Sequence, residues 1–370
     1  MAWNGRWVRV LGLAASRGIL HHPAMSTLRP VLLFPALWLL LAGLLPAQDA
    51  AKPAAPKPQQ KAAKGRTQKA AEFPTHPRVV WLGHSLMTDM PDMVLALARA
   101  TKGLDMTFKD HNIPGAPLRW QWEEEARGTK QYEPQFGMNA NKAIKTGEYD
   151  TLVMVDSVPR GGKQLVEESI DYAGRYLALV QQYRPEDGRT FFYEPWHCTE
   201  TGTPKGCPWD KGNPNAKLTW RERLEADAPM WAGIVDAVNK AHPGRVPMRM
   251  IPAGTALGRL ADAIAKGEVP GFKGFRDLFQ DDIHLNPTGK YFVACVHYAT
   301  IFGRSPEGLP HAIVSRWGRT WWGVELWDKS RWEAPDPKAV KVMQRIAWET
   351  VAGHPLTGVP AAKGTSQPKR

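Results

Sequence analysis

The chain has 370 residues and a formal net charge of +12, which is long enough for one large domain or two small ones. The positive charge is concentrated in three segments, 1–47, 48–72 and 353–370, which carry +4, +4 and +3 and leave only +1 for residues 73–352. A nearly neutral domain lacks the basic surface that nucleic acids attract, so we expect no nucleic-acid partner.

Residues 1–47 are typical of an export signal. From Met25, a short basic start is followed by the apolar stretch Val31–Leu45 and by Ala47, a small residue suited to signal cleavage. The apolar stretch is short for a membrane span and contains Pro35. We therefore expect Met25 to be the true start and the cleaved protein to be periplasmic or secreted, without stable membrane insertion. An uncleaved membrane anchor is the alternative.

Two segments have a composition that is typical of disordered chain. Residues 48–72 are rich in Ala, Pro, Lys and Gln and have no hydrophobic pattern, and residues 353–370 are similar. Residues 73–352 are therefore expected to form a single folded domain that ends in a Trp-rich extension.

Strand-like and helix-like segments alternate along this domain. Buried strands are predicted at 78–83, 105–110, 149–157, 189–195 and 246–254. Helices are predicted between them at 91–101, 166–180, 219–241 and 255–266, with a last one after Pro287. This alternation predicts an α/β fold with a parallel sheet between layers of helices. In such sheets the functional residues lie beyond the carboxyl ends of the strands.

A serine follows the first predicted strand at that edge, and an Asp-x-x-His pair lies near the last helix. Ser85 is two residues beyond the strand, in "WLGHSLM", and Asp281 and His284 are three positions apart in "QDDIHLNP". That spacing brings both side chains to one side of a helical turn or tight loop. Acyl transfer to a serine needs a base for its proton and an acid that orients the base. We predict Ser85 as nucleophile, His284 as base and Asp281 as orienting acid; Asp282 remains the alternative acid.

These two blocks resemble those of the SGNH/GDSL hydrolases, over roughly residues 78–303. The α/β-hydrolase elbow, G-x-S-x-G, fits less well because Met87 replaces its second glycine and because the serine follows the first strand. The resemblance implies a flavodoxin-like three-layer α/β/α sandwich, and it gives Ser85, His284 and Asp281 the roles predicted above. It implies no metal or organic cofactor.

The resemblance also implies an oxyanion hole, from which this sequence departs in part. The family uses the N–H of the serine, a glycine N–H after the second strand and an Asn side chain after the third. Ser85 and Gly115 match the first two donors. The third block reads "VDSVPRGG", with Asp156 but no Asn, so Asn112 is the candidate substitute. His84 also stands where the family has Asp or Asn, and the chain therefore resembles a divergent branch.

Two of the three cysteines lie nine positions apart in a Pro/Gly-rich loop. In an oxidising compartment Cys198 and Cys207 are expected to form a local disulfide. Metal binding by this pair with the adjacent His197 is the alternative. Cys295, in an apolar helical segment, is expected to be an inert core thiol.

Aromatic side chains bear on the substrate. Trp120, Trp196 and His197 are candidates to line the substrate site, whereas most of the tryptophans at 317, 321, 322, 327 and 332 are expected to pack the C-terminal extension onto the domain. The sequence thus predicts an exported serine esterase for a small-molecule or carbohydrate ester, with sugar O-acetyl groups as one candidate. The alternative is a non-catalytic, exported glycan-binding module on a degenerate SGNH fold.

Overall fold

The computed structural model describes residues 73–123 and 139–361, except 211, 245, 327 and 328. The predicted export signal and linker, and residues 362–370 of the predicted tail, lie outside these ranges. No helix within the described ranges combines the length and the apolar character that a membrane crossing requires.

Five parallel strands form one sheet in the order β2-β1-β3-β4-β5. They are β1 (Arg78–Gly83), β2 (Thr107–Asn112), β3 (Thr151–Met154), β4 (Arg189–Tyr193) and β5 (Arg249–Ile251). The three central strands are nearly continuous apolar runs because helices cover both faces of the sheet. This strand order is the flavodoxin-like one, in which the order reverses between β1 and β3.

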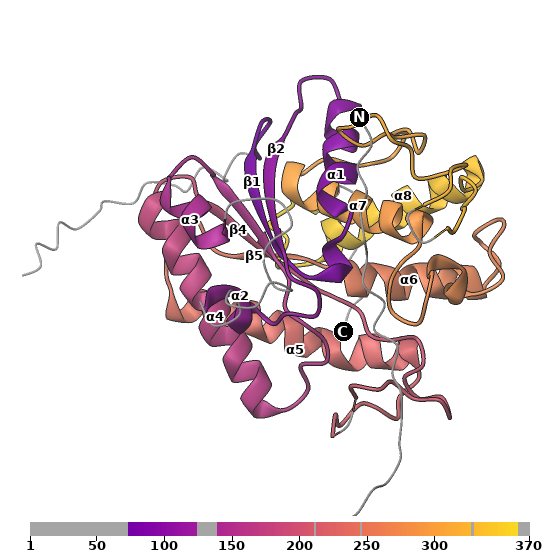
Figure 1. Cartoon of the computed structure of the whole chain (residues 1–370), viewed down its shortest axis with the longest axis horizontal. Coiled ribbons are helices and arrows are strands. Elements are labelled where there is room, and N and C mark those ends of the chain that lie inside the picture. The colour runs from indigo at the N-terminus through magenta and orange to yellow at the C-terminus, as the bar shows by residue number, and fades with distance from the viewer. Residues whose placement is uncertain (1–72, 124–138, 211, 245, 327–328, 362–370) are drawn as a thin grey trace, which may run out of the picture. The chain divides into compact units, whose positions relative to one another are not determined.

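The helices lie in two layers, one on each face of the sheet (Figure 1). One layer consists of α1 (Met90–Arg99), α6 (Ala253–Ala265), α7 (Pro287–Phe302) and α8 (Pro337–Gly353). The other consists of α2 (Leu118–Trp122), α3 (Ala140–Lys145), α4 (Lys163–Tyr183) and α5 (Trp220–Ala241). Alternate residues of β1 face alternate layers, as strand geometry requires. The predicted three-layer α/β/α sandwich is confirmed.

The predicted elements match the structure in position, although three strands are shorter. β3 ends at Met154 rather than 157, β4 ends at Tyr193 rather than 195, and β5 covers only Arg249–Ile251, because the chain continues into buried loops beyond the sheet. Helix α5 begins with a capping box, in which the Thr219 side chain accepts from the N–H of Glu222.

The C-terminal part of the chain differs from the prediction. Helix α8 packs against α6 and α7, and its last residue is Gly353, where the disordered tail was expected to begin. The chain then continues to the edge of the sheet, where the carbonyl of Leu356 accepts from the N–H of Met250 at 2.8 Å. This contact covers the outer edge of β5, which would otherwise leave a backbone donor unpaired. The described chain therefore remains packed beyond 353.

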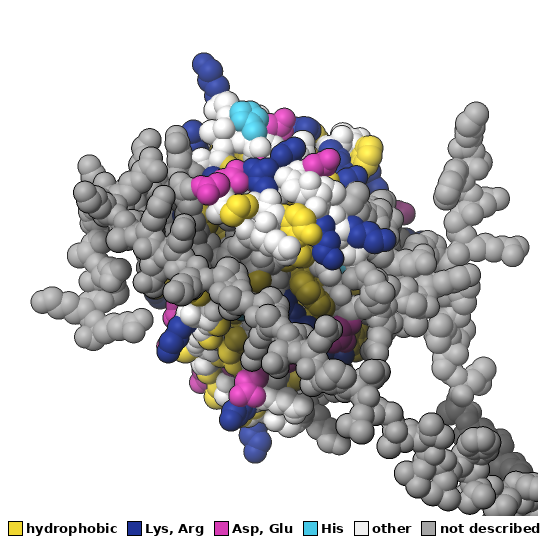
Figure 2. All heavy atoms as spheres, turned by 90° about the vertical axis from the view of Figure 1, so that its left-hand side faces the viewer, with side chains coloured by type: hydrophobic (Ala, Val, Ile, Leu, Met, Phe, Trp, Pro, Cys, Tyr) yellow, Lys and Arg dark blue, Asp and Glu magenta, His cyan; other side chains and the backbone are white. Residues whose placement is uncertain are grey.

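The tryptophans of the C-terminal extension differ in how far they are buried. Trp321 and Trp322 are buried and join the core beneath α7, as expected. Trp317 does not, because 75% of its surface is exposed. On the face shown in Figure 2, basic and acidic side chains of the described residues are interspersed.

Candidate active site

A chain of hydrogen bonds joins the three residues that the sequence singles out. The Ser85 Oγ lies 2.9 Å from the Nε2 of His284, which is 199 positions away in the sequence. The Nδ1 of the same ring lies 2.7 Å from an Asp281 carboxylate oxygen. The fold brings these residues together. Ser85 lies in the turn between β1 and α1, and Asp281 and His284 lie in the loop before α7, which packs beside α1.

The tight loop 280–285 orients the imidazole. The N–H of Gln280 donates to the carbonyl of His284 at 2.9 Å, and Asp281 accepts from the N–H groups of Ile283 at 2.8 Å and His284 at 2.6 Å. Partial burial by itself raises the pKa of Asp281, but these hydrogen bonds outweigh it and hold the pKa below its usual value. A carboxylate that stays ionised keeps the proton on Nδ1, which leaves Nε2 free to accept from Ser85.

Asp282, the alternative orienting acid, faces another part of the molecule. Its carboxylate lies 3.7 Å from the Nζ of Lys205, and its carbonyl accepts from the N–H of Thr199 at 2.6 Å. Of the two neighbouring carboxylates, Asp281 is therefore the one that contacts the imidazole.

Two local features place Ser85 at the edge of the sheet. A Cβ on Gly83 would lie 2.4 Å from Val155, so only glycine lets the chain turn so close to β3. Ser85 then opens a short 3-10 turn, Ser85–Met87, which His84 caps by accepting from the N–H of Leu86 at 3.4 Å. Burial lowers the pKa of His84, and its neutral ring donates through Nε2 to the carbonyl of Asp156 at 3.0 Å. His84 thus links the loop after β1 to the loop after β3.

Asp156 occupies the place of the expected Asn, but its carboxylate serves the fold. The side chain is fully buried, and its Oδ1 accepts from the N–H of Leu118 at 3.0 Å and of Ser157 at 2.8 Å. The same carboxylate pairs with Arg160 at 2.7 Å and accepts from the hydroxyl of Ser169 at 2.7 Å. An unpaired carboxylate at this position would repel an oxyanion, but the charge of Asp156 is paired. Arg160, which the sequence analysis missed, supplies that pairing.

The predicted oxyanion donors lie on the same edge of the sheet. Gly115 occupies the third position of a tight turn after β2, with φ of +69°, and the N–H of Ala116 donates to the carbonyl of Ile113 at 3.0 Å. Asn112 is paired in register with Gly83, and its amide donates to the hydroxyl of Thr88 at 3.4 Å. In the described part of the chain, the N–H groups of Ser85 and Gly115 make no backbone hydrogen bond. Their role as oxyanion donors stays a prediction.

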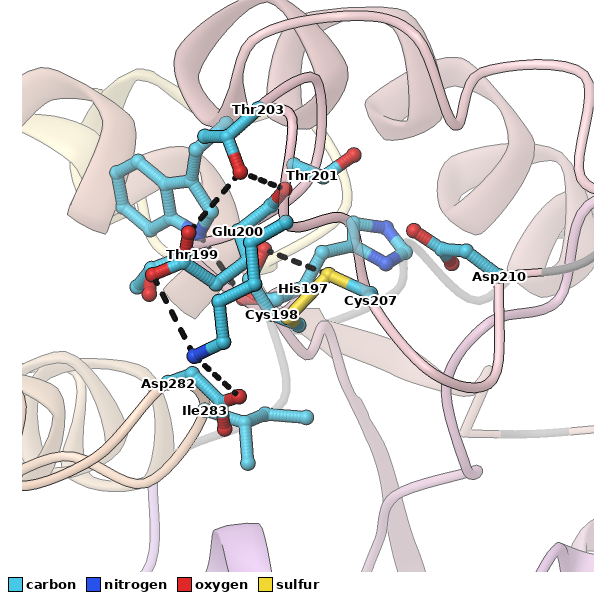
Figure 3. Close-up of a disulfide and its surroundings, with 12 residues drawn as sticks. His197, Cys198, Thr199, Glu200, Thr201, Thr203, Cys207, Asp210, Asp282 and Ile283 are labelled. Carbon is cyan, nitrogen blue, oxygen red and sulfur yellow. Dashed lines mark hydrogen bonds and ion pairs between the residues drawn. A yellow bond between two sulfur atoms is a disulfide. The ribbon is translucent and has the colours of Figure 1, made fainter.

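The predicted disulfide between Cys198 and Cys207 is present (Figure 3). Sulfur atoms bonded to each other are not thiolate ligands, so this pair does not bind a metal in the way that the alternative required. Burial raises the pKa of the Cys295 thiol to about 12, which agrees with an inert core cysteine.

Two of the candidate substrate-lining residues are buried instead. Trp196 is 1% exposed and His197 is 2% exposed, because the disulfide loop covers the chain after β4, so the prediction that they line the substrate site is wrong. The His197 Nε2 lies 2.7 Å from the carboxylate of Asp227 on α5. Trp120 lies half-buried in α2, and its contact with substrate stays a prediction.

The disulfide loop, residues 198–207, supports the loop that carries His284. Figure 3 shows the two loops side by side, with Asp282 at the ion pair that joins them. Besides the Thr199 and Lys205 contacts to Asp282, the indole N–H of the adjacent Trp196 donates to the carbonyl of Ile283 at 2.7 Å. These loops are about 80 positions apart, and no local pattern in the sequence links them.

Removing the disulfide should therefore misplace His284. We expect the double variant Cys198→Ser/Cys207→Ser to lower kcat on para-nitrophenyl acetate about tenfold with little change in KM, because sub-ångström shifts of a catalytic base slow the chemistry. Steady-state kinetics measures both constants. Cys295→Ala is the control and should keep the parent kcat. An unchanged kcat in the double variant would contradict the support of His284 by this loop.

Comparisons with known proteins give only remote likenesses. No family model matches the chain, and no curated protein matches it. Among solved structures, a DUF4886 family protein from Bacteroides uniformis is 17% identical, with a TM-score of 0.46 over 75% of this chain and 95% of its own. A Streptococcus pneumonia protein named as a platelet activating factor is 12% identical, with a TM-score of 0.36 over 61% of this chain and 85% of its own. The salicylyl-acyltransferase SsfX3 from a tetracycline biosynthetic pathway is 10% identical, with a TM-score of 0.32 over 61% of this chain and 53% of its own. Likenesses this remote say nothing about the activity of this chain.

Proposed function

We propose that this chain is an exported serine esterase of the SGNH type, which hydrolyses short carboxylic esters. The observation that carries the proposal is the continuous hydrogen-bond chain from Ser85 through His284 to Asp281 at the carboxyl edge of the sheet. Each member has the chemistry that its place requires: a nucleophile, a base that faces it and an acid that orients the base.

The reaction follows from this geometry. As Ser85 Oγ attacks the ester carbonyl, the Nε2 of His284 takes its proton and then gives it to the leaving alcohol. Water, deprotonated by the same nitrogen, releases the acid from the acyl-enzyme and restores the serine. The N–H groups of Ser85 and Gly115 would hold the oxyanion, and each such donor contributes about 2–4 kcal/mol to lowering the barrier.

The alternative, a glycan-binding module without catalysis, gives no reason for this arrangement. A module that only binds would not need a base placed 2.9 Å from a serine hydroxyl or an ionised acid behind that base. The two departures from the family pattern, His84 and Asp156, have a structural role, because they hold two loops together. Export, the other part of the proposal, is supported by the disulfide, which is typical of oxidising compartments.

Turnover of para-nitrophenyl acetate by the purified chain tests the proposal. We expect hydrolysis, together with loss of activity when an organophosphate ester is bound covalently, and mass spectrometry should locate the adduct on Ser85. The inactivation needs a free nucleophile and base, so it reports on the site even where the ester is a poor substrate. A folded protein that neither hydrolyses the ester nor takes up the label would refute the esterase.

A further inference from the structure

A pocket of about 320 Å³ lies beside the turn that carries Ser85. It is bounded by the start of α1, by the side chains of β2 that point to the same face of the sheet as α1, and by Arg316, Trp317 and Arg319 of the C-terminal extension. Thr88 connects it to the nucleophile: its N–H donates to the carbonyl of Ser85 at 3.1 Å, and its hydroxyl accepts from the Asn112 amide. A ligand in this pocket would therefore lie against the Ser85 turn.

The charges in this pocket nearly cancel. Of its three carboxylates, Asp89 is paired with Lys290 at 2.7 Å, and Asp92 lies 3.6 Å from the guanidinium of Arg316 and also accepts from its backbone N–H at 3.2 Å. The two remaining charged residues of the lining are Asp110 and Arg319, which carry opposite charges. A pocket with balanced charge selects neither a cation nor an anion over a neutral ligand.

Asp110 has unused hydrogen-bonding capacity. It is half-buried on the pocket side of β2, and within the described part of the chain its carboxylate makes no ion pair and no hydrogen bond to another side chain. Burial raises its pKa, although Arg316 opposes this effect. A half-buried carboxylate is stabilised when a ligand donates hydrogen bonds to it, and a pair of neighbouring hydroxyl groups does so well.

An exposed indole completes the lining. Trp317 is 75% exposed, although the other described tryptophans of the extension pack against the domain. The Arg316 guanidinium lies 5.2 Å from the centre of this ring and 4.3 Å from the centre of the Phe108 ring. Its cation–π contacts with both rings connect the extension to β2 at the wall of the pocket. A flat apolar ring beside hydroxyl-binding groups suits the C–H face of a sugar.

We propose that this pocket binds the alcohol part of the substrate, and that this alcohol is a neutral sugar. The inference rests on the proposed function, because an alcohol bound here is the leaving group of an ester whose carbonyl lies toward Ser85. A hydrocarbon chain is a poor occupant because it would strip water from Asp110 and Arg319 without replacing their hydrogen bonds. The acyl group that the enzyme removes is accordingly the small part of the ester, such as acetyl.

Two variants of the full chain test the pocket, with two esters as probes. We expect Asp110→Asn and Trp317→Ala each to lower kcat/KM on mono-O-acetylated methyl glucoside about tenfold or more, mainly through KM, because a hydrogen bond to a charged group or a stacked ring is lost. On para-nitrophenyl acetate, which has no sugar, both variants should stay within about twofold of the parent. Lys109→Gln, on the other side of β2, and Val314→Ala, in the same extension, are matched controls and should behave as the parent with both esters.

Binding without turnover separates this inference from the proposed function. In the Ser85→Ala protein, calorimetric titration with the same sugar ester should show binding that Asp110→Asn weakens about tenfold. If the parent hydrolyses neither ester but this binding is found, the esterase fails and the sugar pocket stands. If the parent hydrolyses the aryl ester, the sugar pocket is overturned by any of three results: equal losses on both esters, no loss on either, or tighter binding of acetylcholine than of the sugar ester.

Discussion

Ser85→Ala should abolish hydrolysis of para-nitrophenyl acetate, with kcat lowered about 10⁴- to 10⁶-fold, as for other serine nucleophiles. The variant removes the Oγ that lies 2.9 Å from the Nε2 of His284, which is the atom proposed to form the acyl-enzyme. The oxyanion donors and the base remain, so a small residual rate above the uncatalysed one is expected. The measurement is kcat at saturating ester, with single-turnover kinetics to separate acylation from deacylation.

The structure predicts that this variant folds normally. The turn at Ser85 is held by backbone hydrogen bonds and by the His84 side chain, and none of these uses the serine hydroxyl. Ser157→Ala is the matched control, because that serine also lies at the carboxyl edge of the sheet and should leave kcat unchanged. Retention of a tenth of the parent activity by Ser85→Ala, in a preparation free of the parent enzyme, would exclude Ser85 as nucleophile.

Asp156→Ala should produce the largest loss of stability, about 3–5 kcal/mol in the free energy of unfolding, because it breaks a buried ion pair from one side. Arg160 is only 3% exposed, and among the described residues it would retain Glu168, at 2.9 Å, as its one ion-pair partner. The N–H groups of Leu118 and Ser157 and the hydroxyl of Ser169 would also lose their acceptor. Urea unfolding followed by circular dichroism measures the change.

Two comparisons make this prediction specific. Asp171→Ala removes an exposed ion pair with Arg175, and it should cost less than about 1 kcal/mol, as surface pairs usually do. Asp156→Asn keeps an acceptor for the N–H groups while it removes the charge, so its loss should lie between the two. If Asp156→Ala were no less stable than Asp171→Ala, the buried network would not have the role assigned to it.

The layered architecture and the placement of Ser85 could be predicted from local sequence. Apolar runs of strand length alternate with segments of helical periodicity, and this pattern needs no knowledge of distant contacts. Parallel strands bring their carboxyl ends to one edge, so the residue after β1 had to lie there. The three-residue spacing of Asp281 and His284 likewise fixes their proximity within one loop.

Contacts between distant segments were decided by the tertiary structure alone. The choice of Asp281 over Asp282 depends on a loop about 80 positions earlier, which engages Asp282 from the other side. The pairing of His84 with the carbonyl of Asp156 spans 72 positions. No local pattern specifies such pairs, because the direction of a side chain is set by what packs around it.

The same reason explains the outcome for two tryptophans. Trp196, a candidate for lining the substrate site, is 1% exposed, whereas Trp317, in the extension whose tryptophans were mostly expected to pack, is 75% exposed. Trp196 packs beside Tyr193 in the core and donates to the carbonyl of Ile283, whereas Trp317 lies with Phe108 and Asp110 of β2 in the lining of the pocket. The sequence by itself determined the sheet, its helical layers and the identity of the Ser–His–Asp residues. Which aromatic and charged side chains border the pocket beside the Ser85 turn was determined only by the packing of segments that are far apart in the chain.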